Sequence, residues 1–177
     1  MNVEKQTLKD FVSGSVRIVG QKVRDFASRP KRKDRVAIGA VLTSMIEDCI
    51  LRYGLEEQIE HGEHAPVDFV WEYLSFGWEC KRFIETEFRN DGHAKAWLKR
   101  EVIDRFREQE RILGKTIRIR GLVINQKRWG EEVDFWLSAQ GFHVLEVGRI
   151  DSKLGMFEAS LVFMSWFEDM VWQICSW

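Results

Sequence analysis

Apolar side chains recur at three- and four-residue intervals along most of this chain, and this spacing constrains the fold more than any other feature. Such spacing is typical of helices that bury one face. The sequence contains two prolines, and Pro66 suits the first turn of a helix. We therefore expect helices over residues 7–27, from a cap at Asp34 to Tyr53, from Pro66 to Phe88, over 93–113 and over 156–175.

The stretch 115–148 is harder to assign. Its segments "TIRIRGLVI", "EVDFWL" and "FHVLEV" alternate in polarity and are rich in β-branched residues, which favours strands. The middle segment also fits a helix, with Val133, Trp136 and Leu137 on one side. The predicted fold class is therefore mainly α, with a short β-hairpin or meander in 115–148 left open. The turn signal "RNDG" divides the chain into two small helical domains, 1–92 and 93–177.

Composition indicates a folded, intracellular protein. Apolar residues make up 45% of the chain and include 8 Trp, so we expect a packed core rather than disorder. No window of 20 residues is free of charge, and the N-terminal stretch lacks the apolar region of a signal peptide, so we expect no membrane segment. The odd set Cys49, Cys80 and Cys175 lies within apolar patterns, which favours buried free thiols over disulfides.

Charge is segregated along the sequence although the net charge is −1. Lys and Arg outnumber Asp and Glu by ten to four in residues 1–35 and again in 96–128. The acids dominate the two other blocks, by twelve to five in 36–95 and by eight to two in 129–177. This alternation predicts a folded surface with a basic face and an acidic face.

The two basic blocks predict contacts with phosphate, because neutralising phosphate releases counterions and requires no reading of bases. One cluster surrounds Pro30 in "SRPKRKDR", where we expect a loop, and the other includes "GKTIRIRG". An import signal is a second interpretation of "PKRK". The predicted RNA-binding residues are Arg29, Lys31, Arg32, Lys33, Arg35, Arg111, Lys115, Arg118, Arg120, Lys127 and Arg128.

The sequence contains two candidate metal-binding segments. "HGEH", with His61 and His64, has no spacing that matches a closed zinc site, so no metal ligand is assigned there. The segment 131–148 is similar to the core of PD-(D/E)XK nucleases. In that family an Asp that opens one strand and a Glu that closes the next hold a divalent metal that activates water.

The nuclease resemblance would make Asp134 and Glu146 the metal ligands, with Glu101 as a third. The family's Lys, two residues after the Glu, is replaced by Gly148, and Lys153 is the nearest substitute. A metal-dependent nuclease is therefore the alternative function. The competing interpretation is a hairpin whose two carboxylates are solvated.

The whole chain resembles the 21-kilodalton RNA-silencing suppressors of closteroviruses, of the beet yellows virus type. The resemblance rests on length, the abundance of Trp, and the basic segments "SRPKRKDR" and "GKTIRIRG". It implies helical two-domain subunits in a homo-oligomeric ring, for example an octamer, in the cytoplasm of the host cell. Single- and double-stranded RNA, including small duplexes, would bind the basic inner wall without sequence preference. On this interpretation the chain is not an enzyme and needs no metal or cofactor.

Overall fold

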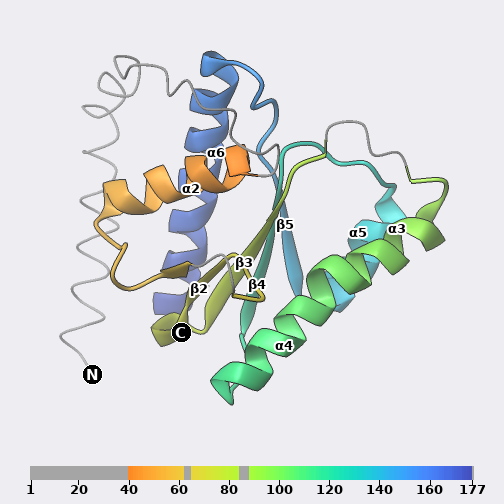
Figure 1. The fold of residues 1–177 in the computed structure, drawn as a ribbon, viewed down its shortest axis with the longest axis horizontal. Helices are drawn as coiled ribbons and strands as arrows, with labels where there is room; N and C mark the ends of the chain where they lie inside the picture. The colour runs from red at the N-terminus through yellow and green to blue at the C-terminus, as the bar shows by residue number, and fades with distance from the viewer. Residues whose placement is uncertain (1–39, 62–64, 84–87, 177) are drawn as a thin grey trace.

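Helices cover both faces of a mixed β-sheet in a computed structural model that describes residues 40–61, 65–83 and 88–176 (Figure 1). The strands lie across the sheet in chain order: β1 (Glu60–His61), β2 (Phe69–Trp71), β3 (Phe76–Lys81), β4 (Ile119–Ile124) and β5 (Phe142–Glu146). The first three strands pair antiparallel, whereas β3, β4 and β5 run parallel to one another.

The helices of the described ranges are α2 (Ala40–Tyr53), α3 (Asp91–Leu98), α4 (Asp104–Leu113), α5 (Glu131–Ala139) and α6 (Lys153–Cys175). A π-helical segment, Lys99–Ile103, joins α3 and α4 into one helix. A short 3₁₀ turn, Glu72–Leu74, connects β2 to β3.

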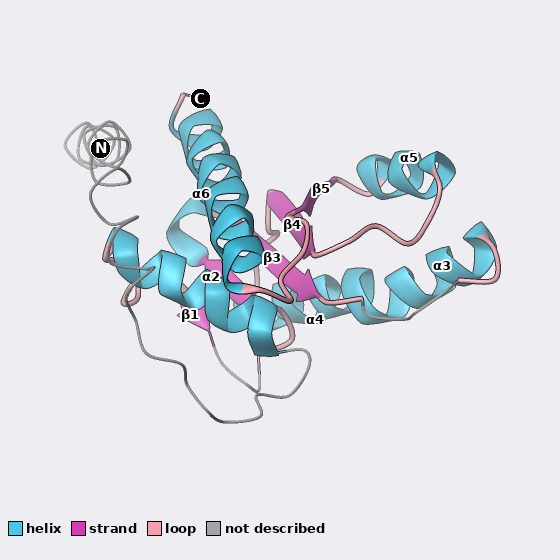
Figure 2. Cartoon of the chain, turned by 90° about the horizontal axis from the view of Figure 1, so that it is seen from above, coloured by secondary structure: helices cyan, strands magenta, loops and turns pink. Residues whose placement is uncertain are grey.

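The sheet separates two buried clusters (Figures 1 and 2). Helices α2 and α6 pack on one face, and α3, α4 and α5 pack on the other. Successive side chains of a strand point to opposite faces, so Phe69 and Trp71 enter the α2–α6 cluster while Val70 enters the other. The same alternation directs Trp78 toward α6 and leaves Glu79 on the α4 face.

The predicted fold class is wrong, because the chain is mixed α/β rather than mainly α. The main error lies in residues 66–88, for which we expected a helix and which contain β2 and β3. β3 has neighbours on both edges and helices on both faces, so its apolar and its polar residues are both largely buried. The alternation in "FGWECK" spans only six residues, whereas the apolar residues between Val70 and Phe88 also fit a helical spacing, and this longer pattern predicted the helix.

The stretch 115–148 contains two of the three expected strands, with a helix between them. Strands β4 and β5 form within "TIRIRGLVI" and "FHVLEV", as predicted. The segment between them is α5, which confirms the helical interpretation of Val133 and Leu137, both buried. Because β4 and β5 are parallel and α5 crosses between them, the expected hairpin is wrong.

Three of the predicted helices are confirmed, as α2, as α3 continued by α4, and as α6. The three cysteines are buried thiols that form no disulfide among the described residues, also as predicted. The predicted helix over 7–27 lies outside the described residues. Within the described ranges, no helix combines the length and the apolar character needed to cross a membrane.

Gly121 on β4 gives a test of how closely α6 packs on the sheet. A Cβ atom added there would lie 2.7 Å from Trp166 Cη2 on α6 and 2.8 Å from Trp78 Cβ on β3. We expect Gly121→Ala to lower the free energy of unfolding by about 1–3 kcal/mol, because Trp78 Cβ is fixed to the buried strand β3 and Trp166 would have to shift on α6. Urea denaturation measures this loss.

Gly130→Ala is the matched control, because its added Cβ would meet its nearest neighbour, Asp91, at 3.6 Å. Its cost should be about 1 kcal/mol or less, from the N-cap position alone. Equal stability of wild type and Gly121→Ala would contradict the described packing of α6.

Candidate metal centre

Two carboxylates meet where β2 begins beside β3. Asp68 directly precedes β2, and the pairing of Phe69 with Trp78 places Asp68 next to Glu79 on β3. The main-chain N–H of Asp68 donates to Glu79 Oε2 at 3.1 Å. In return, the main-chain N–H of Cys80 donates to Asp68 Oδ2 at 2.8 Å. We call Asp68 and Glu79 the carboxylate pair.

Glu79 is fully buried yet carries a carboxylate that accepts from two cations. Lys81 Nζ lies 2.5 Å from Glu79 Oε1, and Arg105 Nη1 lies 2.7 Å from the same oxygen. Lys81 follows Glu79 by two residues, so both side chains leave the same face of β3. Arg105 reaches the site from α4, on the helical layer that covers this face.

The electrostatics of the pair favour a bound cation. Burial raises the pKa of Glu79 above its usual range, the Asp68 carboxylate raises it further, and Lys81 and Arg105 oppose the shift. Two adjacent carboxylates in a low-dielectric environment repel each other, and a divalent cation between them would relieve both costs. Mg²⁺ is commonly held by one or two carboxylates, with water and substrate oxygens completing its coordination.

The donor set suits such an ion better than a closed metal cage. Among residues 40–61, 65–83 and 88–176, no three His, Cys, Asp or Glu side chains gather closely enough to hold a metal by themselves. The hard oxygen ligands of the carboxylate pair match Mg²⁺ or Mn²⁺ rather than zinc. An ion held by the carboxylate pair would therefore need water or another oxygen ligand to complete its coordination.

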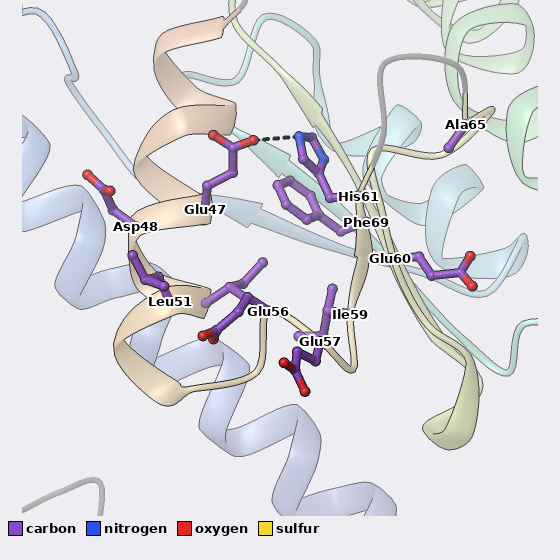
Figure 3. A pocket seen from close by; sticks show the side chains of 11 residues that line it. Glu47, Asp48, Leu51, Glu56, Glu57, Ile59, Glu60, His61, Ala65 and Phe69 are labelled. Carbon is purple, nitrogen blue, oxygen red and sulfur yellow. Dashed lines mark ion pairs between the residues drawn. The ribbon is translucent and has the colours of Figure 1, made fainter.

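His61 supports Asp68 from the opposite side of the sheet. Its Nδ1 donates to the main-chain carbonyl of Asp68 at 2.7 Å, and its ring stacks on Phe69 with the ring centroids 4.4 Å apart. Its Nε2 lies 2.5 Å from Glu47 Oε1 on α2, across a cavity of about 720 Å³ bounded by α2, β1 and β2 (Figure 3). Glu47 and His61 thus orient the main chain of Asp68 from outside the carboxylate pair.

The predicted nuclease ligands occupy different surroundings. Asp134 lies in the first turn of α5, not at the start of a strand, and accepts from Lys127 Nζ and Trp129 Nε1. Glu146 ends β5 and accepts the main-chain N–H of Lys127. Glu101 pairs with its neighbour Arg100 at 2.7 Å. Asp134 and Glu146 are therefore engaged with the segment around Lys127, and neither contacts the carboxylate pair in any interaction found among the described residues.

Carboxylates also engage most of the predicted RNA-binding residues in the described ranges. The ion pairs are Arg111 with Glu108, Lys115 with Glu72, Arg120 with Glu110 and Lys127 with Asp134, at 2.6–2.8 Å. Arg118 is exposed and Arg128 is partly buried. Arg29, Lys31, Arg32, Lys33 and Arg35 lie outside the described residues, as does His64 of "HGEH". The RNA-binding role of the predicted Lys and Arg residues stays a prediction.

The sequence does contain a signal for the carboxylate pair. Asp68 is followed by Glu79-Cys80-Lys81, which has the Glu-X-Lys order of PD-(D/E)XK nucleases. This is the order that Gly148 interrupts in the segment 131–148. The helix expected over 66–88 hid this order, because a helix would place Asp68 and Glu79 far apart along its axis. Recognising β2 and β3 as neighbouring strands brings the two carboxylates together.

Comparisons with protein-family models, with curated proteins and with solved structures give no match to this chain. The site is therefore interpreted from its own geometry.

Metal binding tests the carboxylate pair directly. We expect Mn²⁺ or Mg²⁺ to raise the melting temperature of the wild-type protein, because an ion bound to the folded state stabilises it by mass action. Asp68→Asn and Glu79→Gln should each lose this increase. Asp134→Asn and Glu146→Gln make the same chemical changes elsewhere and should keep it. Loss of the increase in the Asp134 and Glu146 variants alone would place the ion at residues 131–148 instead.

The raised pKa of Glu79 predicts how metal-free stability depends on pH. Because the folded protein retains a proton that the unfolded chain releases, the stabilisation is complete below the ordinary pKa of Glu, about 4.3, and is lost as pH rises through the folded value. As the pH rises above the ordinary pKa of Glu, the melting temperature of the wild type in EDTA should fall more than that of Glu79→Gln. Identical pH profiles would show that Lys81 and Arg105 fully compensate the buried charge.

Proposed function

We propose that this chain is a metal-dependent nuclease that hydrolyses phosphodiester bonds at Asp68, Glu79 and Lys81. The observation that carries this proposal is the carboxylate pair joined across β2 and β3, with a lysine two residues after the glutamate. PD-(D/E)XK nucleases use these groups in this order. The chain therefore resembles that family at residues 68–81, and the departure noted at Gly148 does not arise there.

The three side chains have two roles in the proposed reaction. Asp68 and Glu79 would hold the divalent ion, which when bound polarises a phosphoryl oxygen and lowers the pKa of water. Hydrogen bonds to the main chain at Asp68 and Cys80 fix the two carboxylates relative to each other, so little reorganisation is needed. The ammonium group of Lys81 lies beside the pair. Its positive charge would attract the phosphate oxygens, and its Nζ holds the protons that could be donated to them.

Nucleic acid is the substrate class that the surroundings favour. Two cations, Lys81 and Arg105, converge on one carboxylate oxygen, and a phosphodiester brings the negative charge that such a pair of cations can share. Arg105 belongs to the block 96–128, in which Lys and Arg outnumber the acids by ten to four. A nuclease also needs contacts to the phosphate backbone, so RNA binding by the run from Arg29 to Arg35 would be compatible with this function.

Cleavage assays test the proposal. Duplex DNA, single-stranded DNA and RNA are each incubated with the protein and Mg²⁺ or Mn²⁺. We expect cleavage of at least one substrate, abolished by EDTA and reduced by about a hundredfold or more in Asp68→Asn and in Glu79→Gln, because each removes a metal ligand.

Asp134→Asn and Glu146→Gln serve as controls for the loss of a carboxylate and should cleave as the wild type does. Substrates that change mobility but stay intact under every condition would contradict the nuclease. That result would support the non-enzymatic RNA-binding function expected from the resemblance to the viral suppressors.

A further inference from the structure

The π-helical segment Lys99–Ile103 sets which residues of α4 face the sheet. Residues at four-residue intervals along the continuous helix are buried, namely Ala94, Leu98, Val102 and Phe106. In a regular α-helix, residues twelve positions apart are rotated by about 120° around the axis, and one extra residue in a π turn removes about 100° of this. The segment therefore keeps Phe106 on the sheet and brings its neighbour Arg105 to Glu79. π-helical turns within α-helices occur frequently at functional sites.

Arg105 and Lys81 share one oxygen of Glu79, so a metal ion that binds this oxygen would displace one of them. A carboxylate oxygen has two lone pairs, so Glu79 Oε1 has no capacity for a third strong partner. Lys81 is tied to the site by its place on β3, and its side chain is 16% exposed. The Arg105 side chain is 41% exposed and comes from a different element, so it has room to leave the carboxylate.

We propose that Arg105 exchanges partners: it holds Glu79 in the metal-free protein and binds the substrate phosphate when a divalent ion occupies the carboxylate pair. This inference rests on the proposed nuclease function. A planar guanidinium released beside the metal presents two parallel N–H donors, which match two oxygens of a phosphodiester. Arg105 is therefore a substrate-binding residue that also competes with the metal.

The competition gives Arg105 an experimental signature that a merely structural residue lacks. A residue that only shapes Glu79 would weaken metal binding when removed. Removing a cation that competes with the metal should strengthen metal binding, because less of the negative charge of the carboxylate pair is then neutralised by the protein. Metal affinity and substrate affinity should therefore change in opposite directions.

The test measures Mn²⁺ affinity by calorimetry without nucleic acid, and KM for whichever nucleic acid the wild type cleaves. In Arg105→Gln we expect Mn²⁺ to bind about threefold more tightly or better, because a competing cation has gone. We expect KM to rise about tenfold, because the phosphate loses a bidentate partner. Arg105→Lys should fall between the two proteins in KM, since it keeps the charge but not the planar fork.

Arg107→Gln is the matched control. Arg107 lies on the same helix, is 60% exposed and pairs with Asp104 at 3.1 Å, so its removal changes the charge of α4 without touching the pair. It should retain wild-type metal affinity and KM. Melting curves of each variant confirm that the fold is intact.

Three results would overturn the role of Arg105. Weaker Mn²⁺ binding in Arg105→Gln would make it a structural support for Glu79. If Arg105→Gln cleaves nucleic acid and binds Mn²⁺ as the wild type does, then Arg105 has neither proposed role, and the nuclease function still stands. A wild-type protein that neither binds Mn²⁺ nor cleaves any nucleic acid would overturn the proposed function and, with it, this inference.

Discussion

Strand β3 determines the arrangement of the rest of the molecule because the sheet changes from antiparallel to parallel pairing at this strand. Its neighbour β2 is antiparallel, and its neighbour β4 is parallel. Parallel neighbours cannot be joined by a tight turn, so the chain crosses from β3 to β4 through α3 and α4. This crossover places α4 over the face of β3 that carries Glu79. The pairing that completes the sheet thus also brings a second cation to a fully buried carboxylate.

Helices that cover the sheet could be predicted from the sequence, whereas strands β2 and β3 could not. α2 and the joined α3 and α4 carry apolar stripes with a helical period, because each buries one side and leaves the other in water. The six residues of β3 do alternate, but so short a pattern is outweighed by the helical spacing that apolar residues also keep from Val70 to Phe88. Strand β4 was recognisable because Ile119 and Arg120 at its start are only partly buried and retain β-branched alternation.

The candidate site failed to emerge for the same reason. Ten residues separate Asp68 from Glu79 in the sequence, and only the pairing of β2 with β3 makes them neighbours. Asp134 and Glu146 were suggested because 131–148 was interpreted as two strands, although Asp134 lies on α5. Under the proposed function, the Glu-X-Lys chemistry belongs instead to residues 68–81. What the sequence lacked was the contact between strands, not the Glu-X-Lys order itself.

The π-helical segment absorbs one extra residue without changing the face that α4 presents to the sheet. Deleting a single residue between Lys99 and Ile103 would restore a regular helix and leave the same side chains of α4 facing β3, because residues eleven positions apart in an α-helix differ by only about 20° around the axis. Keeping the extra residue in a regular helix would instead rotate α4 by about 100° relative to α3 and bring another side chain next to Glu79. Relatives of this chain can therefore differ in length by one residue at this segment and still keep the charge beside Glu79. Comparisons between such relatives should therefore align the helix on either side of residues 99–103 separately.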